Sequence, residues 1–273
     1  DAMNEEKDDW KPERYHEYGY FPGCVDFMDV EVKFTHLNKG DADHASIAAA
    51  SIKLLNYADI DPLVLDMNVF KCSGHDQLWQ GNLEVFDSLK EHNLRRIKES
   101  GVKIITCSCA ECYRTFAVDY DLPGTLGIKV EHITQTLQGR GLKFKSPENV
   151  TVAYHDPCRL GRMMGEYEAP RDLIQLVDGA TMVELENNKE RALCCGVSSM
   201  MYCNDATKAV RRKRLDQGSD AGIDLMLGGC PKCYMHMQCM LNEERMNPEE
   251  GHHHDYEMMD LMQFLVACLE EKS

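Results

Sequence analysis

The chain has 273 residues, with 30 Lys and Arg against 46 Asp and Glu, which gives a formal net charge of −16. This length allows one or two domains with a core of their own, and a composition of 43% hydrophobic and 28% charged residues is ordinary for a globular protein. The acidic balance excludes nucleic acid as the main partner and disfavours an anionic membrane surface, because both would need a basic face.

The 13 cysteines stand out from this composition. The longest stretch without a charged residue, 192–204, is shorter than the roughly 20 apolar residues of a membrane-spanning helix, so we predict no transmembrane segment. The start of the chain does not resemble a signal peptide. We therefore predict a cytoplasmic, reducing location, where cysteines are more often ligands or catalysts than disulfides. Attachment to the face of a membrane complex stays open.

After a charged arm over residues 1–18, the chain repeats one order of elements twice. A first strand is expected at 18–21 and again at 150–154, a helix at 42–57 and 169–177, and a second strand at 62–65 and 181–185. A long helix follows at 83–100 and 205–217, and a third strand at 102–106 and 223–227. Each third strand runs into a Cys-x-x-Cys motif, from which another helix leaves.

Alternating strands and helices predict right-handed β-α-β units and parallel sheets. We expect an α/β fold of two pseudo-duplicated domains, residues 19–145 and 146–273, each a small parallel sheet flanked by helices. A linker is expected at 143–149, around Ser146-Pro147. Because every cysteine group lies after a strand and before a helix, we expect the groups to meet at the carboxyl ends of the strands.

The cysteine groups of the two halves match in order. Soft thiolates select zinc, copper(I) or iron–sulfur clusters, and five convergent cysteines exceed the four ligands of a zinc ion or an ordinary [4Fe–4S] cube. The second half has five, and the first half has four with a serine at the matching place: Cys158, Cys194-Cys195-Gly196 and Cys230-Pro231-Lys232-Cys233, against Cys24, Cys72-Ser73-Gly74 and Cys109-Ala110-Glu111-Cys112.

The second pattern, Cys-x(35)-Cys-Cys-Gly-x(33)-Cys-Pro-x-Cys, resembles the signature of the cysteine-rich CCG domain. Over residues 17–270 the chain resembles the catalytic B and D subunits of heterodisulfide reductases, most clearly at 20–24, 73–76, 108–116, 154–162, 192–196 and 230–236. The resemblance implies a non-cubane [4Fe–4S] cluster held by the five cysteines of each intact motif. It also implies reduction of a disulfide at that cluster, with electrons from a ferredoxin-like partner.

Carried over position by position, the resemblance implies that the second motif is complete. Its non-cubane cluster would be bound by Cys158, Cys194, Cys195, Cys230 and Cys233. In the first motif Ser73 replaces the fifth cysteine. A four-ligand centre, [4Fe–4S] or zinc, or a cluster with one altered ligand is then implied at Cys24, Cys72, Cys109 and Cys112.

Catalysis is expected at Cys194 and Cys195 together with His155. This histidine can give a proton to a leaving thiolate or can order its loop. Arg159, Arg162 and Lys232 can balance cluster charge or hold an anionic substrate, or can lie in solvent. The basic run at 211–214 is interpreted as a solvated or subunit-facing helix face. Cys107 is interpreted as a buried strand-end residue rather than a fifth ligand.

The resemblance thus predicts the iron–sulfur catalytic subunit of a heterodisulfide-reductase-type complex, acting on a disulfide of the CoM-S-S-CoB type. Its implied partners are a ferredoxin-like iron–sulfur subunit and further electron-supplying subunits, because the sequence has no Gly-x-Gly-x-x-Gly fingerprint and no ferredoxin-type cysteine run. Three alternatives stay open: a single-site subunit acting on a sulfur-carrier disulfide or trisulfide, an electron relay, and a zinc-stabilised scaffold.

Overall fold

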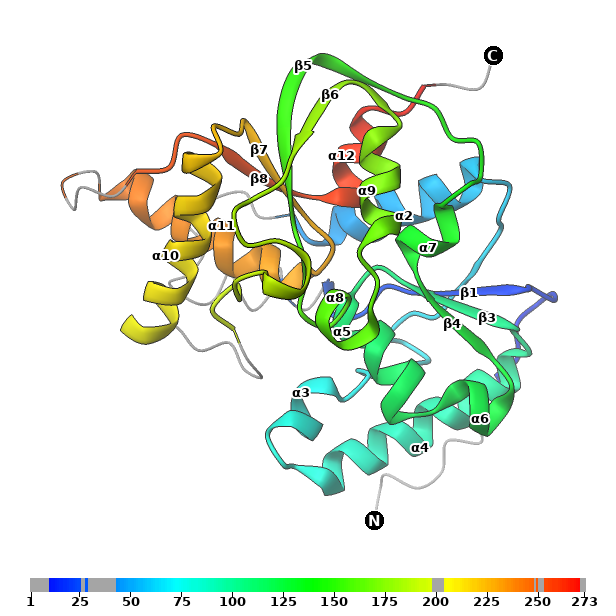
Figure 1. Cartoon of the computed structure of the whole chain (residues 1–273). Helices are drawn as coiled ribbons and strands as arrows, with labels where there is room; N and C mark the ends of the chain where they lie inside the picture. Colours follow the sequence, from blue (N-terminus) through cyan, green and yellow to red (C-terminus); the bar gives the residue numbers. More distant parts are fainter. Residues whose placement is uncertain are drawn as a thin grey trace.

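A computed structural model describes residues 10–25, 28, 43–197, 204–247, 249 and 253–270. They form two four-stranded sheets, and all strand pairs within each sheet are parallel. The first sheet has the order β2-β1-β3-β4 and the second has the order β6-β5-β7-β8. Since the two orders are the same when counted along each half, the structure confirms the predicted α/β fold with its internal duplication (Figure 1).

The strands of the first sheet are β1 (Tyr18–Phe21), β2 (Leu63–Val64), β3 (Ile104–Cys107) and β4 (Lys129–His132), and those of the second are β5 (Phe144–His155), β6 (Val177–Val183), β7 (Leu225–Gly228) and β8 (Glu257–Asp260). The helices of the first half are α2 (Ala45–Tyr57), α3 (His75–Trp79), α4 (Leu83–Ser100), α5 (Ala110–Arg114), the π-helix η1 (Thr115–Asp119), α6 (Leu122–Leu126) and α7 (Ile133–Leu137). The second half has α8 (Gly161–Met164), α9 (Glu168–Gln175), the 3-10 helix η2 (Lys189–Arg191), α10 (Asp205–Asp220), α11 (Pro231–Met246) and α12 (Leu261–Ala267).

The expected linker at 143–149 was wrong, because these residues belong largely to β5. Phe144 pairs with Val177 of β6, and the register then shifts between Lys145 and Val150. This irregularity accommodates Pro147, which cannot donate a ladder hydrogen bond. The second strand of this half also begins earlier than expected, at Val177 instead of 181.

The helix that ends each half packs on the other half. Helix α7 follows the first sheet and packs against α9, while α12 follows the second sheet and packs against α2. Figure 1 draws these four helices together between the two sheets. One apolar cluster therefore unites residues of both halves, among them Leu54, Leu137, Leu173 and Leu265, so the halves share a core.

Both terminal helices begin in the same way. His132 caps α7 and Asp260 caps α12, and each forms a reciprocal capping box with the glutamine three residues later, Gln135 or Gln263. The glutamine of the capping box is thus the same in both halves, whereas the N-cap residue is a histidine in the first half and an aspartate in the second.

Candidate metal centres

The cysteines of the second half converge at the carboxyl end of its sheet. The Sγ atoms of Cys195 and Cys233 lie 3.2 Å apart, and hydrogen bonds link Cys194 to Cys195 and Cys230 to Cys233. Burial raises the pKa of Cys158 to about 11, and the neighbouring Cys195 and Cys230 add to that rise. Such crowding is what several ligands of one metal centre require.

The cysteines of the first half form a matching group. The Sγ atoms of Cys24 and Cys72 lie 3.6 Å apart, and a hydrogen bond joins Cys109 to Cys112. Ser73 is buried, with its Oγ 3.4 Å from Cys112 Sγ. The serine hydroxyl therefore takes the place among these sulfurs that Cys195 takes in the second group.

The glycine that follows each pair has the same left-handed backbone, with φ of 80° at Gly74 and 82° at Gly196. This conformation favours glycine over any residue with a Cβ. At Gly196 a Cβ would also lie 2.4 Å from the backbone oxygen of Thr207. The Cys-Cys-Gly and Cys-Ser-Gly turns therefore share the same left-handed backbone conformation at their glycine.

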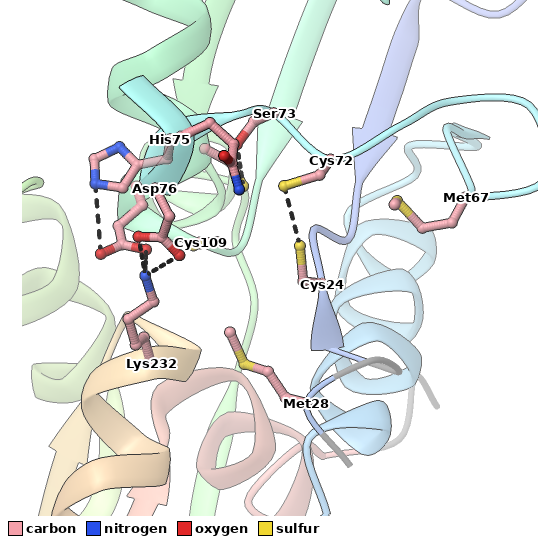
Figure 2. Close-up of a pocket in the computed structure, with 12 residues that line it drawn as sticks. Cys24, Met28, Met67, Cys72, Ser73, His75, Asp76, Cys109 and Lys232 are labelled. Carbon is pink, nitrogen blue, oxygen red and sulfur yellow. Dashed lines mark hydrogen bonds and ion pairs between the residues drawn. The ribbon is translucent and has the colours of Figure 1, made fainter. Parts of the chain in front are cut away.

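The two groups meet, because Cys109 of the first group hydrogen-bonds Cys230 of the second. Beside them, Lys232 Nζ lies 2.5 Å from Asp76 Oδ1 and 2.9 Å from Glu111 Oε2 (Figure 2). Lys232 and Glu111 hold the same position in the two Cys-x-x-Cys motifs. Each motif thus contributes one side chain to this buried contact at the junction, and Lys232 is not a solvated surface residue.

A cavity of about 330 Å³ opens on the first group. Burial raises the pKa of Glu111 in its wall to about 8. The other lining residues are the first-half cysteines, two methionines and a polar wall that includes one lysine of the second half: Cys24, Cys72, Cys109, Cys112, Met28, Met67, Ser73, His75, Asp76, Gln77 and Lys232.

Arg159 also crosses from the second half to the first. Its Nε donates to His75 Nε2 at 3.2 Å, and its guanidinium lies 3.9 Å from the centre of the Trp79 ring. Burial, aided by the charge of Arg159, lowers the pKa of His75 to about 2, so this histidine is neutral. Arg162 instead donates to the backbone oxygens of Glu190 and Ala192 and fixes the loop before Cys194.

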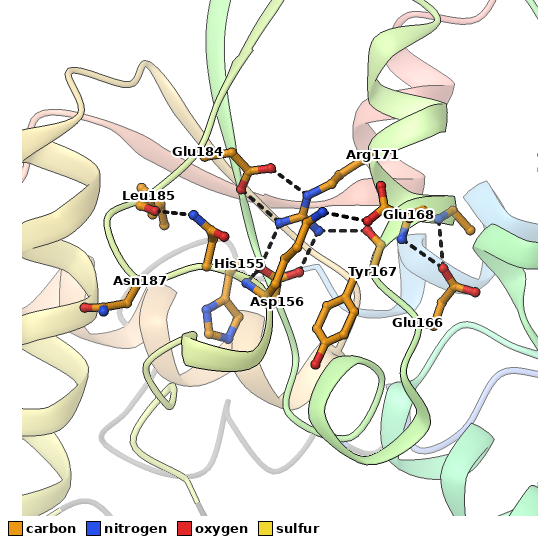
Figure 3. Close-up of polar contacts among 12 residues, drawn as sticks. His155, Asp156, Glu166, Tyr167, Glu168, Arg171, Glu184, Leu185 and Asn187 are labelled. Carbon is orange, nitrogen blue, oxygen red and sulfur yellow. Dashed lines mark hydrogen bonds and ion pairs between the residues drawn. The ribbon is translucent and has the colours of Figure 1, made fainter.

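The loop that carries Cys158 is held by an ion-pair network (Figure 3). Arg171 donates to both carboxylate oxygens of Asp156, at 2.7 and 3.0 Å. It also donates to both oxygens of Glu184, at 2.7 and 2.9 Å, and Lys189 adds a backbone N–H to Asp156. Such bidentate contacts fix a backbone strongly, so Asp156 has a structural role behind Cys158.

His155 lies between this loop and the sulfurs of the second group. Its side chain hydrogen-bonds Cys195, and His155, Cys195 and Cys233 place their ligand atoms within 4.8 Å of one another. Arg214 Nε donates to His155 Nδ1 at 3.0 Å. Burial lowers the pKa of His155, so the neutral ring carries its proton on Nε2.

Two arginines behind the second group were missed by the sequence interpretation. The run at 211–214 was assigned to a solvated or subunit-facing face, but Arg211 and Arg214 are both 0% exposed. Arg211 Nε donates to the backbone oxygen of Cys195 at 3.2 Å, and its Nη2 lies 2.9 Å from His236 Nδ1. The helical spacing of three residues, which puts both on one face of α10, was the available signal.

Buried polar atoms test whether this site suits an anionic metal centre. Within the described ranges, Arg214 Nη2 and His236 Nε2 have no hydrogen-bond partner, and the charge of Cys195 acts on His236. Buried donors of this kind are costly unless an acceptor is present. A metal held by thiolates would supply negative charge here, and its soft sulfur donors suit zinc or iron–sulfur clusters. The residues present therefore fit such a group.

The remaining cysteines are less informative. Cys107 ends β3 in the apolar core with no exposed surface, in line with its interpretation as a buried strand-end residue. Cys268 is likewise buried in the core. Cys203 lies outside the described residues. Within the described part of the chain, no helix has the length and hydropathy needed to cross a bilayer.

Comparisons with known proteins agree with this geometry. The profile of the family described as "Cysteine-rich domain" (CCG) matches residues 18–117 and 152–238. The D subunit of the dihydromethanophenazine:CoB--CoM heterodisulfide reductase of Methanosarcina barkeri is 30% identical over 213 residues, which are 74% of this chain and 52% of that protein. The "Probable iron-sulfur-binding oxidoreductase FadF" of Bacillus subtilis is 30% identical over 75% of this chain and 30% of its own length.

Among solved structures, the crystal structure of a hypothetical protein from Helicobacter pylori matches with a TM-score of 0.54 at 10% identity. The match covers 97% of this chain and 51% of that one, and it supports the fold alone. The chain spans about half the length of the heterodisulfide reductase relatives that it matches.

Proposed function

This chain belongs to the cysteine-rich CCG domain family, and from that premise we propose that it is an iron–sulfur subunit of a disulfide-reducing oxidoreductase. The observation that carries the proposal is the convergence of the second-half cysteines, where Cys195 Sγ lies 3.2 Å from Cys233 Sγ. An electron relay needs no more than a four-ligand cube, and a fifth cysteine in the same group favours a catalytic centre.

In this proposal the second group binds a non-cubane [4Fe–4S] cluster through Cys158, Cys194, Cys195, Cys230 and Cys233. The first group, Cys24, Cys72, Cys109 and Cys112, binds an ordinary [4Fe–4S] cluster or zinc. When bound, the non-cubane cluster of the second group would supply single electrons and an iron atom that a substrate sulfur can reach. The side chains of this protein would bind the cluster, position the substrate and donate hydrogen bonds to the ligand sulfurs.

Exposure indicates the side from which a disulfide approaches the second group. Cys194 and Cys158 are partly exposed, whereas Cys195, Cys230 and Cys233 are buried. The substrate therefore meets the Cys194 side, which the Arg162 contact to the Ala192 carbonyl holds in place. Behind it, the neutral His155 donates its Nε2–H toward Cys195, and this hydrogen bond stabilises negative charge on that sulfur.

For the substrate we propose a disulfide of the CoM-S-S-CoB type, because the heterodisulfide reductase relatives are named for it. A ferredoxin-like iron–sulfur subunit supplies the electrons. In domain terms, residues 19–145 carry the degenerate site and 146–273 the complete one, after an arm over 1–18. The alternative substrate is a disulfide or trisulfide on a sulfur-carrier protein, and the alternative role is an electron relay.

One anaerobic experiment tests the proposal. The protein is loaded with iron and sulfide, its metal and sulfide content is measured, and its reduced and oxidised forms are examined by EPR. The loaded protein then receives CoM-S-S-CoB with reduced viologen as the electron donor. Iron–sulfur signals with thiol release support the proposal, signals without thiol release favour the carrier-protein or relay alternatives, and a colourless zinc protein overturns it.

A further inference from the structure

Two fully buried arginines stand behind the second cysteine group. Arg211 and Arg214 project from α10, and neither is exposed to solvent. Arg211 reaches the backbone oxygen of Cys195 directly. Arg214 reaches the Cys195 side chain through one intervening ring, His155. Both guanidinium groups therefore interact with Cys195, one directly and the other through a single intervening side chain.

Arg214 lacks a carboxylate among its hydrogen-bond partners in the described part of the chain. Its Nη1 donates to the Asn187 backbone oxygen at 2.6 Å and to Gln217 Oε1 at 2.9 Å, and its Nη2 has no partner there. By contrast, Arg171 of the same half is held by two carboxylates. Burial lowers the pKa of Arg214 to about 10, which leaves it charged at neutral pH.

The first cysteine group is built with neutral residues at comparable places. Asn93 of α4 donates to the backbone oxygen of Cys72 at 3.1 Å, one residue before Ser73, whereas Arg211 donates to the backbone oxygen of Cys195 itself. Phe21 ends β1 three residues before Cys24, as His155 ends β5 before Cys158. Lys232, whose charge acts on Cys24 and Cys72 of the first group, is already paired with Asp76 and Glu111.

A buried cation with no carboxylate among its hydrogen-bond partners, as Arg214 is in the described part of the chain, is costly, and it persists where a nearby negative charge offsets it. We infer that Arg211 and Arg214 are the fixed counter-charges of an anionic metal centre at the second cysteine group, and that they raise its reduction potential. Each electron that enters the centre adds negative charge, and a nearby fixed positive charge in a poorly polarisable interior stabilises that reduced form.

His155 transmits the effect of Arg214. With Nδ1 accepting from the guanidinium, the ring presents its Nε2 proton to Cys195, and a hydrogen bond to a ligand sulfur also raises the potential of a cluster. The inference rests on the metal centre of the proposed function and is independent of the substrate. It makes Arg211 and Arg214 positioning residues that act through Cys195 and His155.

The first test is a redox titration of the iron–sulfur-loaded protein, reduced stepwise with dithionite and followed by EPR. Arg214→Gln should lower the ratio of reduced to oxidised second centre at fixed potential by about tenfold, which is about 59 mV for a one-electron couple. Arg214→Lys keeps the charge and should stay close to the parent. Arg96→Gln is the matched control, since Arg96 is a buried arginine of α4 that pairs with Glu99.

The second test compares thermal unfolding of the metal-free and the metal-loaded protein. A counter-charge predicts that Arg214→Gln costs more stability in the loaded form than in the metal-free form, whereas a merely structural arginine would cost the same in both. Arg211→Gln repeats the comparison if Arg214→Gln fails to fold. An unshifted potential in a loaded variant, or equal losses in both forms, would overturn the inference. If the protein binds zinc in place of iron, the proposed cofactor is wrong. The comparison of metal-free and zinc-loaded stability then decides whether Arg214 is a counter-charge of the metal centre.

Discussion

The two cysteine groups occupy equivalent ends of two sheets with the same strand order, yet their surroundings differ in charge. The second group has five cysteines, His155 and two buried arginines, and the first has four cysteines, Ser73 and the neutral Asn93. The shared backbone explains why cysteine side chains gather at the same place in both halves. The side chains around it explain why only one of them is expected to do chemistry.

The strongest way to break this comparison is to exchange the one side chain that separates the ligand sets. Cys195→Ser gives the second group the serine of the first. It should lower disulfide reduction by more than about 100-fold, since residues that merely support metal ligands are already worth 10–100-fold. Ser73→Cys should instead change the EPR spectrum of the first centre. An active Cys195→Ser protein with an unchanged cluster would show that the two groups are interchangeable.

The ion pair at the junction tests whether the two groups depend on each other. Lys232→Glu would bring a third carboxylate against Asp76 and Glu111, and it should cost about 3–5 kcal/mol in the free energy of unfolding, as broken buried pairs do. The exchange Glu111→Lys with Lys232→Glu should recover part of that loss in urea unfolding. As a control, Arg245→Glu disrupts an exposed pair with Glu257 and should change little. An equal loss of unfolding free energy for Lys232→Glu and Arg245→Glu would show that the buried contact of Lys232 does not hold the two halves together.

The capping residues of α7 and α12 should give the halves opposite pH dependence. Burial raises the pKa of Asp260 to about 7 and lowers the pKa of His132 to about 4. The stability that Asp260 contributes is complete below its unfolded pKa of 3.8 and is lost as pH rises through about 7. That of His132 is complete above 6.5 and is lost as pH falls through about 4.

Asparagine at either position can keep a capping oxygen and cannot ionise. Relative to the parent, Asp260→Asn should therefore add up to about 4 kcal/mol at pH 8, and His132→Asn up to about 3 kcal/mol at pH 4, from 1.36 kcal/mol per pKa unit. Each should have little effect at the other pH. Denaturant unfolding at both pH values measures this, and parallel effects of the two substitutions would refute it.

The smallest expected difference lies in two equivalent tyrosines. Tyr20 shares a 2.9 Å hydrogen bond with Ser108, whereas the hydroxyl of Tyr154 has no partner among the described residues and would lie 2.7 Å from a Cβ at Gly229. Tyr20→Phe should cost about 1 kcal/mol, while Tyr154→Phe should be neutral or stabilising. A similar cost for both, measured in urea, would show that Tyr154 has an unseen acceptor.

The sequence contained enough information for the fold and for the two cysteine groups. Repeated spacing fixes which residues follow a strand, and parallel topology then brings those residues to one sheet edge. Spacing says less about where one element ends and the next begins. Ser146-Pro147 indicated a linker between the two domains, but a register shift allows β5 to continue through these residues.

The long-range contacts could not be predicted in the same way. Arg211 and Arg214 lie in a basic run that composition assigns to solvent, and their burial depends on where α10 packs against the site. Lys232 faces Glu111 across 121 positions of sequence, a pairing set by how the two halves dock. Local patterns carry no such information.

The reciprocal packing of α7 on α9 and of α12 on α2 has an evolutionary consequence. Exchange of equivalent helices around a twofold axis is the geometry of a homodimer with an isologous interface, so the chain has the architecture of two fused copies of one ancestral subunit. In a homodimer the central positions of the two Cys-x-x-Cys motifs would be identical, and a Glu111–Lys232 pair could not exist. Two copies joined in one chain are free of that constraint, so the two Cys-x-x-Cys motifs can carry different residues at the same position.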